Sequence, residues 1–166
     1  MTPDHDSGHG PLIERLPFVH DYLCSLDVAV GPIVSLGPGP YGERRVVDIV
    51  GGRVEGPGMT GVVVAGGADW QVARVDGVVD IEAHYSLLLD DGARVEVVSS
   101  GLRFGAPEVL QRLGRGEPVD PSEYFFRTFL RFQTGAARLQ ALNRTLAVAI
   151  GARRADRVEL TVYRVD

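Results

Sequence analysis

Two Asp-Gly pairs, Asp76-Gly77 and Asp91-Gly92, enclose one alternating segment and constrain the fold of this chain more than any other feature. Asp-Gly between two apolar runs is typical of a tight β-hairpin, because a type I′ turn needs positive φ at both of its central positions. Residues 78–89 between the two pairs are therefore predicted to form a strand with an antiparallel neighbour on each side.

Short valine-rich runs separated by glycine and proline continue this pattern along the chain, which holds 24 Val, 21 Gly and 10 Pro. They predict nine to ten strands with period-2 alternation. These are residues 24–36, 45–50, 53–55, 60–65, 70–75, 78–89, 93–99, 123–133, 145–151 and 157–165. Closure into a barrel would leave no strand edge exposed.

We therefore predict an all-β fold, a single closed antiparallel β-barrel with one or two short helices, near residues 107–113 and before Cys24. Residues 1–15 show no apolar periodicity and are expected to form a flexible N-terminal tail. The remaining residues, 16–166, are expected to form one barrel domain, in keeping with the chain's length of 166 residues.

Composition excludes several classes of function. A net charge of −5 argues against nucleic acid as a partner, and no apolar run is long enough to span a membrane. All 17 basic residues are arginine, so Schiff-base chemistry and a P-loop lysine are excluded. His5 and His9 lack a third ligand, and no Gly-x-Gly-x-x-Gly motif follows a strand at the head of a helix, so neither metal nor cofactor is expected. We see no targeting segment and expect a cytoplasmic protein; self-association stays open.

Several motifs resemble those of the DUF3237 family, also called UPF0311, over about residues 24–166. They are Gly42-Glu43-Arg44-Arg45, Gly51-Gly52-Arg53-Val54-Glu55-Gly56-Pro57, Gly66-Gly67-Ala68-Asp69-Trp70-Gln71, Tyr85-Ser86-Leu87, Asp90-Asp91-Gly92, Pro121-Ser122-Glu123-Tyr124-Phe125-Phe126-Arg127-Thr128, Phe132-Gln133-Thr134-Gly135 and Leu142-Asn143. The resemblance implies a single-domain antiparallel β-barrel, similar in outline to lipocalins. It supplies a fold and not a reaction, because the biochemical role of the family is largely unassigned.

The densest cluster of candidate site residues is Asp69-Trp70-Gln71, directly after two glycines. One interpretation is a loop at the barrel mouth that presents an acid, an indole N–H and an amide to a ligand. The other is a structural corner, in which Asp69 accepts backbone N–H groups and Trp70 fills the core. We expect Trp70 to be mostly buried near one end of the barrel, since a buried indole of this size makes a natural floor or lid.

His84 shares one face of its predicted strand with Glu82, while the opposite face is apolar. Polar faces of antiparallel sheets usually meet water. A ligand-binding barrel can instead have a polar lumen, and Glu82 would then raise the pKa of His84 toward neutrality. Our hypothesis is that both residues face the lumen and that His84 is the proton-transfer residue, with Asp69 or Arg127 as its partner.

Arg44 and Arg127 match positions of the family and carry the planar fork that suits carboxylate or enolate oxygens. A salt bridge to a carboxylate is the alternative for each of them. Tyr124 and Asn143 could add hydrogen bonds to a ligand.

Two functions remain open. The first is a cofactor-independent acid–base enzyme (an isomerase, cyclase or dehydratase) of bacterial secondary or small-molecule metabolism, with its substrate in the barrel. The second is a non-catalytic, lipocalin-type carrier of a hydrophobic ligand. Proton-transfer groups in the lumen would favour the enzyme, and an apolar lumen would favour the carrier.

Overall fold

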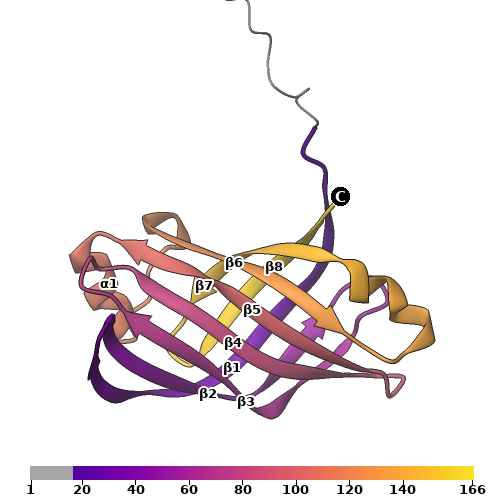
Figure 1. Ribbon diagram of the computed structural model, residues 1–166, viewed down its shortest axis with the longest axis horizontal. Coiled ribbons are helices and arrows are strands. Elements are labelled where there is room, and N and C mark those ends of the chain that lie inside the picture. The colour runs from indigo at the N-terminus through magenta and orange to yellow at the C-terminus, as the bar shows by residue number, and fades with distance from the viewer. Residues whose placement is uncertain (1–16) are drawn as a thin grey trace, which may run out of the picture.

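Over residues 17–166, which the computed structural model describes, eight strands follow one another around a closed antiparallel barrel (Figure 1). The predicted all-β barrel with short helices is therefore confirmed. Each strand pairs with the next, and the last strand pairs with the first, so no long edge is left free. The strands are β1 (His20–Gly39), β2 (Gly42–Glu55), β3 (Gly61–Ala73), β4 (Val79–Leu89), β5 (Arg94–Gly105), β6 (Tyr124–Gln133), β7 (Leu146–Arg153) and β8 (Arg157–Val165).

The strands are fewer than the nine to ten predicted, because two glycine pairs bend strands instead of ending them. Gly51 and Gly52 lie inside β2, which keeps its pairing with β1 while its register with β3 shifts. Gly66 and Gly67 lie inside β3 at a second register shift. A Cβ on Gly52 would lie 2.1 Å from the carbonyl oxygen of Asp27, so the close approach of two strands requires glycine there. Such bulges bend strands at the corners of barrels.

The two predicted hairpins form at the expected places, but their turn type differs from the prediction. Gly77 and Gly92 have positive φ, at 85° and 87°, whereas among the described residues no amino acid other than glycine does. Asp76 and Asp91 instead stabilise three-residue loops through their side chains, which accept hydrogen bonds from the backbone N–H groups of Val78 and Ala93. A three-residue loop with glycine in the left-handed region is the next commonest hairpin connection.

Helix α1 (Pro107–Gly114) covers the predicted segment and lies at one end of the barrel (Figure 1). Two short 3₁₀ helices, η1 (Pro121–Glu123) and η2 (Ala137–Arg144), precede and follow β6. Over residues 17–23 the helical piece expected before Cys24 does not form, because β1 begins at His20. The predicted tail, residues 1–15, lies outside the described residues. Among those described, no helix is long and apolar enough to cross a membrane.

The interior of the barrel differs between its two ends. At the end that η2 covers, aliphatic side chains pack without exposure, including Leu87, Val95 and Leu130. Leu139 and Leu142 of η2 complete this core. Toward the end where α1 lies, polar inward residues such as Gln71 and Arg103 join the apolar ones, and open space remains. This half of the barrel holds the candidate site.

Candidate functional site

An inner cavity of about 40 Å³ lies in the barrel beyond the packed core. Its walls are mostly apolar, and Asp69, Tyr85, Ser99 and Thr128 are the polar residues that line it. Three of its polar atoms are buried without a hydrogen-bond partner within residues 17–166: Asp69 Oδ1, the Tyr85 hydroxyl and Thr128 Oγ1. Buried polar atoms nearly always have a partner, which can be protein, water or ligand. Several orphaned atoms around one cavity therefore favour a site that takes a polar group from outside the chain.

Asp69 is held in a defined orientation at this cavity. Its Oδ2 accepts a hydrogen bond of 2.6 Å from Nε2 of Gln71, its neighbour on the inner face of β3. Burial raises the pKa of the Asp69 carboxyl above its ordinary value, while the Gln71 hydrogen bond and the charge of Arg103 act in the opposite direction. Burial also raises the pKa of Tyr85, so its hydroxyl keeps its proton and can donate a hydrogen bond.

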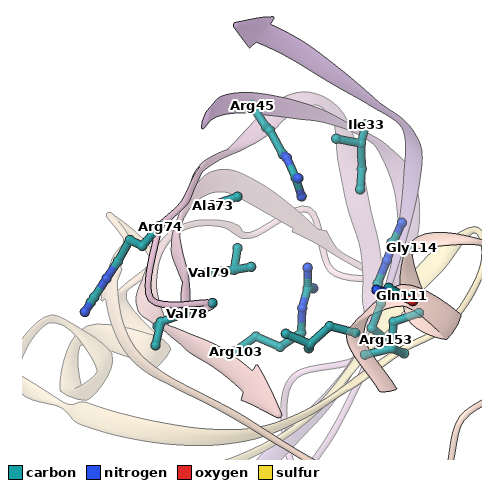
Figure 2. A pocket seen from close by; sticks show the side chains of 13 residues that line it. Ile33, Arg45, Ala73, Arg74, Val78, Val79, Arg103, Gln111, Gly114 and Arg153 are labelled. Carbon is teal, nitrogen blue, oxygen red and sulfur yellow. The ribbon is translucent and has the colours of Figure 1, made fainter. Parts of the chain in front are cut away.

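A larger pocket of about 350 Å³ opens at the α1 end of the barrel (Figure 2). Arg45 and Arg103 point into it from opposite walls, and Arg153 lines it near the end of α1 (Figure 2). Burial, together with the charge of Arg153, lowers the pKa of Arg103 to about 10. Burial also lowers the pKa of Arg153. Both guanidinium groups stay protonated at neutral pH but are poorly solvated, which favours an anion between them.

Comparison with known proteins places the chain in a family. A family model described as "Protein of unknown function (DUF3237)" matches residues 19–165. The chain belongs to the DUF3237 family. A UPF0311 protein of Rhodopseudomonas palustris is 43% identical over 144 residues, which cover 87% of this chain and 94% of that protein.

Solved structures share the DUF3237 barrel. A crystal structure of a conserved protein of unknown function from R. palustris matches with a TM-score of 0.87 at 40% identity, covering 92% of this chain and 100% of that one. A β-barrel-like protein from Acinetobacter baumannii matches with a TM-score of 0.80 at 32% identity, over 92% and 99% of the two chains. A protein from Penicillium herquei, described as an enzyme, matches with a TM-score of 0.71 at 19% identity, over 93% and 98%. This last likeness shows the fold alone.

The predicted lumen orientation of Glu82 and His84 is wrong. Both side chains lie on the outer face of β4, and Nε2 of His84 lies 2.6 Å from Oε1 of Glu96 on the neighbouring strand. The inner face consists of the apolar alternate positions, among them Ile81 and Tyr85. Strand alternation allows only one of these two faces to be inside, and the larger apolar area is the one removed from water.

Trp70 is also outside, against the prediction that it is mostly buried. It follows an inward residue, Asp69, so it points outward and is 43% exposed. The guanidinium of Arg44 lies over its ring at 5.6 Å, which places Arg44 on the outer face as well. Arg127 likewise stacks on an outer aromatic ring, that of Phe125, and donates to the carbonyl oxygen of Phe126. These arginines and Trp70 therefore do not reach the lumen.

Asn143 lies at the far end of the barrel, where it exchanges hydrogen bonds with the backbone of Thr134. It fixes the loop after β6 and does not line the site. Tyr124 does face inward, and its hydroxyl accepts a hydrogen bond of 2.8 Å from the backbone N–H of Arg153. Of the predicted site residues, Asp69, Gln71 and Tyr124 thus lie on the inner side of the barrel.

The sequence reading missed Arg45, Arg103, Arg153, Tyr85 and Thr128. A usable signal existed for three of them. Arg103 continues the inward alternation of Val95, Val97 and Ser99 on β5, and Tyr85 and Thr128 are polar residues within the apolar alternation of β4 and β6. Within the described residues, no group of three His, Cys, Asp or Glu side chains is placed to hold a metal ion.

Proposed function

We propose that the barrel lumen is the site of a cofactor-independent acid–base reaction on a small molecule, an isomerisation, cyclisation or dehydration, in which Asp69 moves the proton. The observation that carries this proposal is the buried Oδ1 of Asp69, which faces the inner cavity without a partner in the described part of the chain. The earlier hypothesis for His84 gives way to Asp69, because a proton-transfer group must reach its substrate.

The environment of Asp69 suits proton transfer near neutral pH. A general acid or base works best when its pKa lies near the working pH, and burial shifts the pKa of Asp69 in that direction. The Gln71 hydrogen bond holds one carboxyl oxygen, so the other points into the cavity in a fixed direction. A fixed orientation lowers the entropic cost of reaching the reactive geometry.

The surrounding groups suit the charge that such a reaction develops. The Asp69 carboxylate removes a proton from a carbon next to a carbonyl group, and the electron pair of the C–H bond moves to the carbonyl oxygen. Tyr85 and Thr128, whose hydroxyl groups have no hydrogen-bond partner in the part of the chain that the structure describes, can donate hydrogen bonds to that oxygen. Return of the proton to a different carbon completes an isomerisation without any oxidant or reductant.

Two of the comparisons support a catalytic function. The P. herquei protein of the same fold is described as an enzyme, so this kind of barrel is compatible with catalysis. The curated relatives include bacterial proteins, which agrees with a role in bacterial small-molecule metabolism. A carrier function is the second candidate, and the apolar lining of the inner cavity, including Ile49, Phe126 and Leu160, favours it.

The test is proton exchange in D₂O. A panel of enolisable ketones and 1,3-dicarbonyl compounds is incubated with the protein, and deuterium incorporation is followed by NMR. We expect exchange with the wild type and a loss of about 10²- to 10⁴-fold in Asp69→Asn. Asp48→Asn, on the outer face of β2, is the matched control and should keep the wild-type rate.

Exchange that is equal in the wild type and Asp69→Asn would overturn the assignment of Asp69. Binding of apolar compounds without exchange of any of them would favour the carrier instead.

A further inference from the structure

The pocket of about 350 Å³ at the α1 end of the barrel, called the mouth pocket from here on, holds Arg103, which has no hydrogen-bond or ion-pair partner among the described residues. Arg103 is only 7% exposed, and within residues 17–166 its side chain makes neither a hydrogen bond nor an ion pair. The guanidinium of Arg103 lies over the ring of Phe126, at 5.6 Å from the ring centre, in a cation–π contact. Figure 2 shows the Arg103 side chain pointing into the pocket. A buried charge without a partner is costly, so such a group is expected to meet an anion.

The neighbouring charges do not neutralise Arg103. Arg45 is already paired with Glu43, at 2.5 Å between Nη2 and Oε2. Arg74 points away from the pocket (Figure 2) and is paired with Asp76 and Asp80.

Arg153 also lines the pocket, and its charge lowers the pKa of Arg103. Asp69 acts on both guanidinium groups through its charge without an ion pair to either within residues 17–166, and Asp156 acts on Arg153 in the same way. Arg103 thus has one carboxyl group near it, that of Asp69, whose pKa burial raises, and the charge of Arg153 repels its own charge. A negative charge between Arg103 and Arg153 would offset this repulsion.

We infer that the mouth pocket binds the carboxylate of a small apolar acid between the guanidinium groups of Arg103 and Arg153. This inference rests on the proposed function, since it names the substrate class for the same lumen. The guanidinium fork matches the two oxygens of a carboxylate. The volume of about 350 Å³ lies at the lower end of the range of small-molecule pockets.

The walls of the pocket favour a carboxylate over a phosphate. Leu110, Gln111, Leu113 and Gly114 come from the C-terminal half of α1, the end at which the helix dipole is negative. A negative helix end opposes a dianion more strongly than a monoanion. Ile33, Val78 and Val79 add apolar surface, which suits an aromatic or alicyclic body attached to the acid group.

Asp69 lies deeper in the barrel than Arg103, as the pairing of β3, β4 and β5 shows. Arg103 pairs with Val79 and Ser99 pairs with Ala83, while Ala83 also pairs with Asp69. Ser99 therefore lies at the level of Asp69, and on β5 it is two inward positions further into the barrel than Arg103. A ligand whose carboxylate is held at the mouth would extend its apolar body toward the proton-transfer group.

The experiment is calorimetric titration with benzoate and cyclohexanecarboxylate, compared with benzamide and inorganic phosphate. We expect the two carboxylates to bind, and benzamide and phosphate to bind at least about 10-fold more weakly. Arg103→Met and Arg153→Gln should each weaken carboxylate binding by about 10- to 100-fold. Arg74→Met is the matched control, because Arg74 borders the same pocket but points away, and its affinity should equal that of the wild type.

Equal binding of benzoate and benzamide, or tighter binding of phosphate than of benzoate, would overturn the inference. Unchanged benzoate affinity in Arg103→Met and Arg153→Gln would overturn it as well. Thermal unfolding of each variant shows that it is folded, and Arg153→Gln keeps the test decisive if Arg103→Met does not fold.

The two proposals fail separately. Suppose that carboxylate binding depends on Arg103 and Arg153 but that Asp69→Asn exchanges protons at the wild-type rate. The proposed chemistry would then be wrong, and the carboxylate site would stand. Proton exchange that depends on Asp69, together with equal binding of benzamide and benzoate, would support the proposed chemistry and overturn the carboxylate site.

Discussion

Nε2 of Gln71 donates a hydrogen bond of 2.6 Å to Oδ2 of Asp69, while Oδ1 of the same carboxyl group is buried without a partner in residues 17–166. The two residues are neighbours on the inner face of β3, with Trp70 between them on the outer face. One oxygen is therefore fixed and the other is free for a ligand. The hydrogen bond also lowers the pKa of Asp69, in opposition to burial, which raises it.

The buried carboxyl group predicts a pH-dependent gain in stability for Asp69→Asn. Because the pKa of Asp69 is raised above 3.8 in the folded state, the folded protein holds this proton more tightly than the unfolded chain does. The resulting penalty is absent below 3.8, where both states are protonated. It grows as pH rises from 3.8 to the folded-state pKa and stays constant above that pKa. Removal of the ionisable group should therefore stabilise the protein at neutral pH.

Urea unfolding at several pH values measures this difference. The gain should shrink steadily as the pH is lowered toward the ordinary pKa of aspartate. Asp48→Asn, on the outer face of β2, should show no such trend. A variant Asp69→Asn that is less stable than the wild type at neutral pH would contradict the direction of the pKa shift.

Gln71→Leu is predicted to raise the pKa of Asp69 further. The substitution removes the side-chain hydrogen bond that favours the ionised carboxyl group and leaves burial in place. The ¹³C chemical shift of the Asp69 carboxyl carbon, followed against pH, reports this pKa directly. Gln133→Leu, at an exposed position at the end of β6, is the control and should leave the titration unchanged. An unshifted or lower titration midpoint in Gln71→Leu would count against the role given to this hydrogen bond.

Local patterns in the sequence were sufficient for the fold. The Asp-Gly turns at Gly77 and Gly92 and the period-2 runs predicted the antiparallel barrel, because both signals act between neighbouring strands. The strand count was too high because a glycine pair has the same sequence whether it turns a chain or bends it. Only the pairing of β2 with β1 beyond Gly51 separates the two cases.

The site was harder to predict, because it depends on which face of each strand closes inward. Asp69 and Gln71 were found, while Trp70 between them was assigned to the same loop although alternation sends it outside. The two arginines of the proposed carboxylate site are far apart in sequence, with Arg103 on β5 and Arg153 at the end of β7. Closure of the barrel brings them to one mouth, and no local pattern encodes that juxtaposition.

Trp70 is the one tryptophan of the chain, so its exposure can be read from fluorescence. With 43% of the residue exposed, its emission should be red-shifted from that of a buried indole and quenched by acrylamide. Trp70→Ala should destabilise the protein by less than the about 3–5 kcal/mol typical of buried aromatic residues. Phe126→Ala, which truncates a ring that is 3% exposed, should show the full loss. Equal losses in the two variants would mean that Trp70 is part of the core.

His84→Gln is predicted to leave proton exchange unchanged. His84 lies on the outer face of β4 beside Glu96, separated from the inner cavity by the sheet itself. The substitution removes the exposed ion pair but no group that faces a ligand. The D₂O exchange assay, run beside Asp69→Asn, gives the comparison. A fall in exchange rate in His84→Gln similar to that in Asp69→Asn would restore the original hypothesis for His84.

Gly151→Ala is predicted to destabilise the barrel and to narrow the inner cavity. A Cβ at Gly151 would lie 2.7 Å from Cγ and Cδ1 of Phe126, closer than real contacts allow, so the ring must move. Phe126 lines the inner cavity and lies under the guanidinium of Arg103, so its displacement reaches both parts of the candidate site.

Overpacking of this kind costs about 1–3 kcal/mol. Gly135→Ala is the matched control, because a Cβ there would meet nothing within 4 Å, and its stability should equal or slightly exceed that of the wild type. Urea unfolding measures both variants, and benzoate titration of Gly151→Ala should show weaker binding than the wild type. Wild-type stability in Gly151→Ala would mean that Phe126 has room to yield, and that the inner cavity is larger than its static volume indicates.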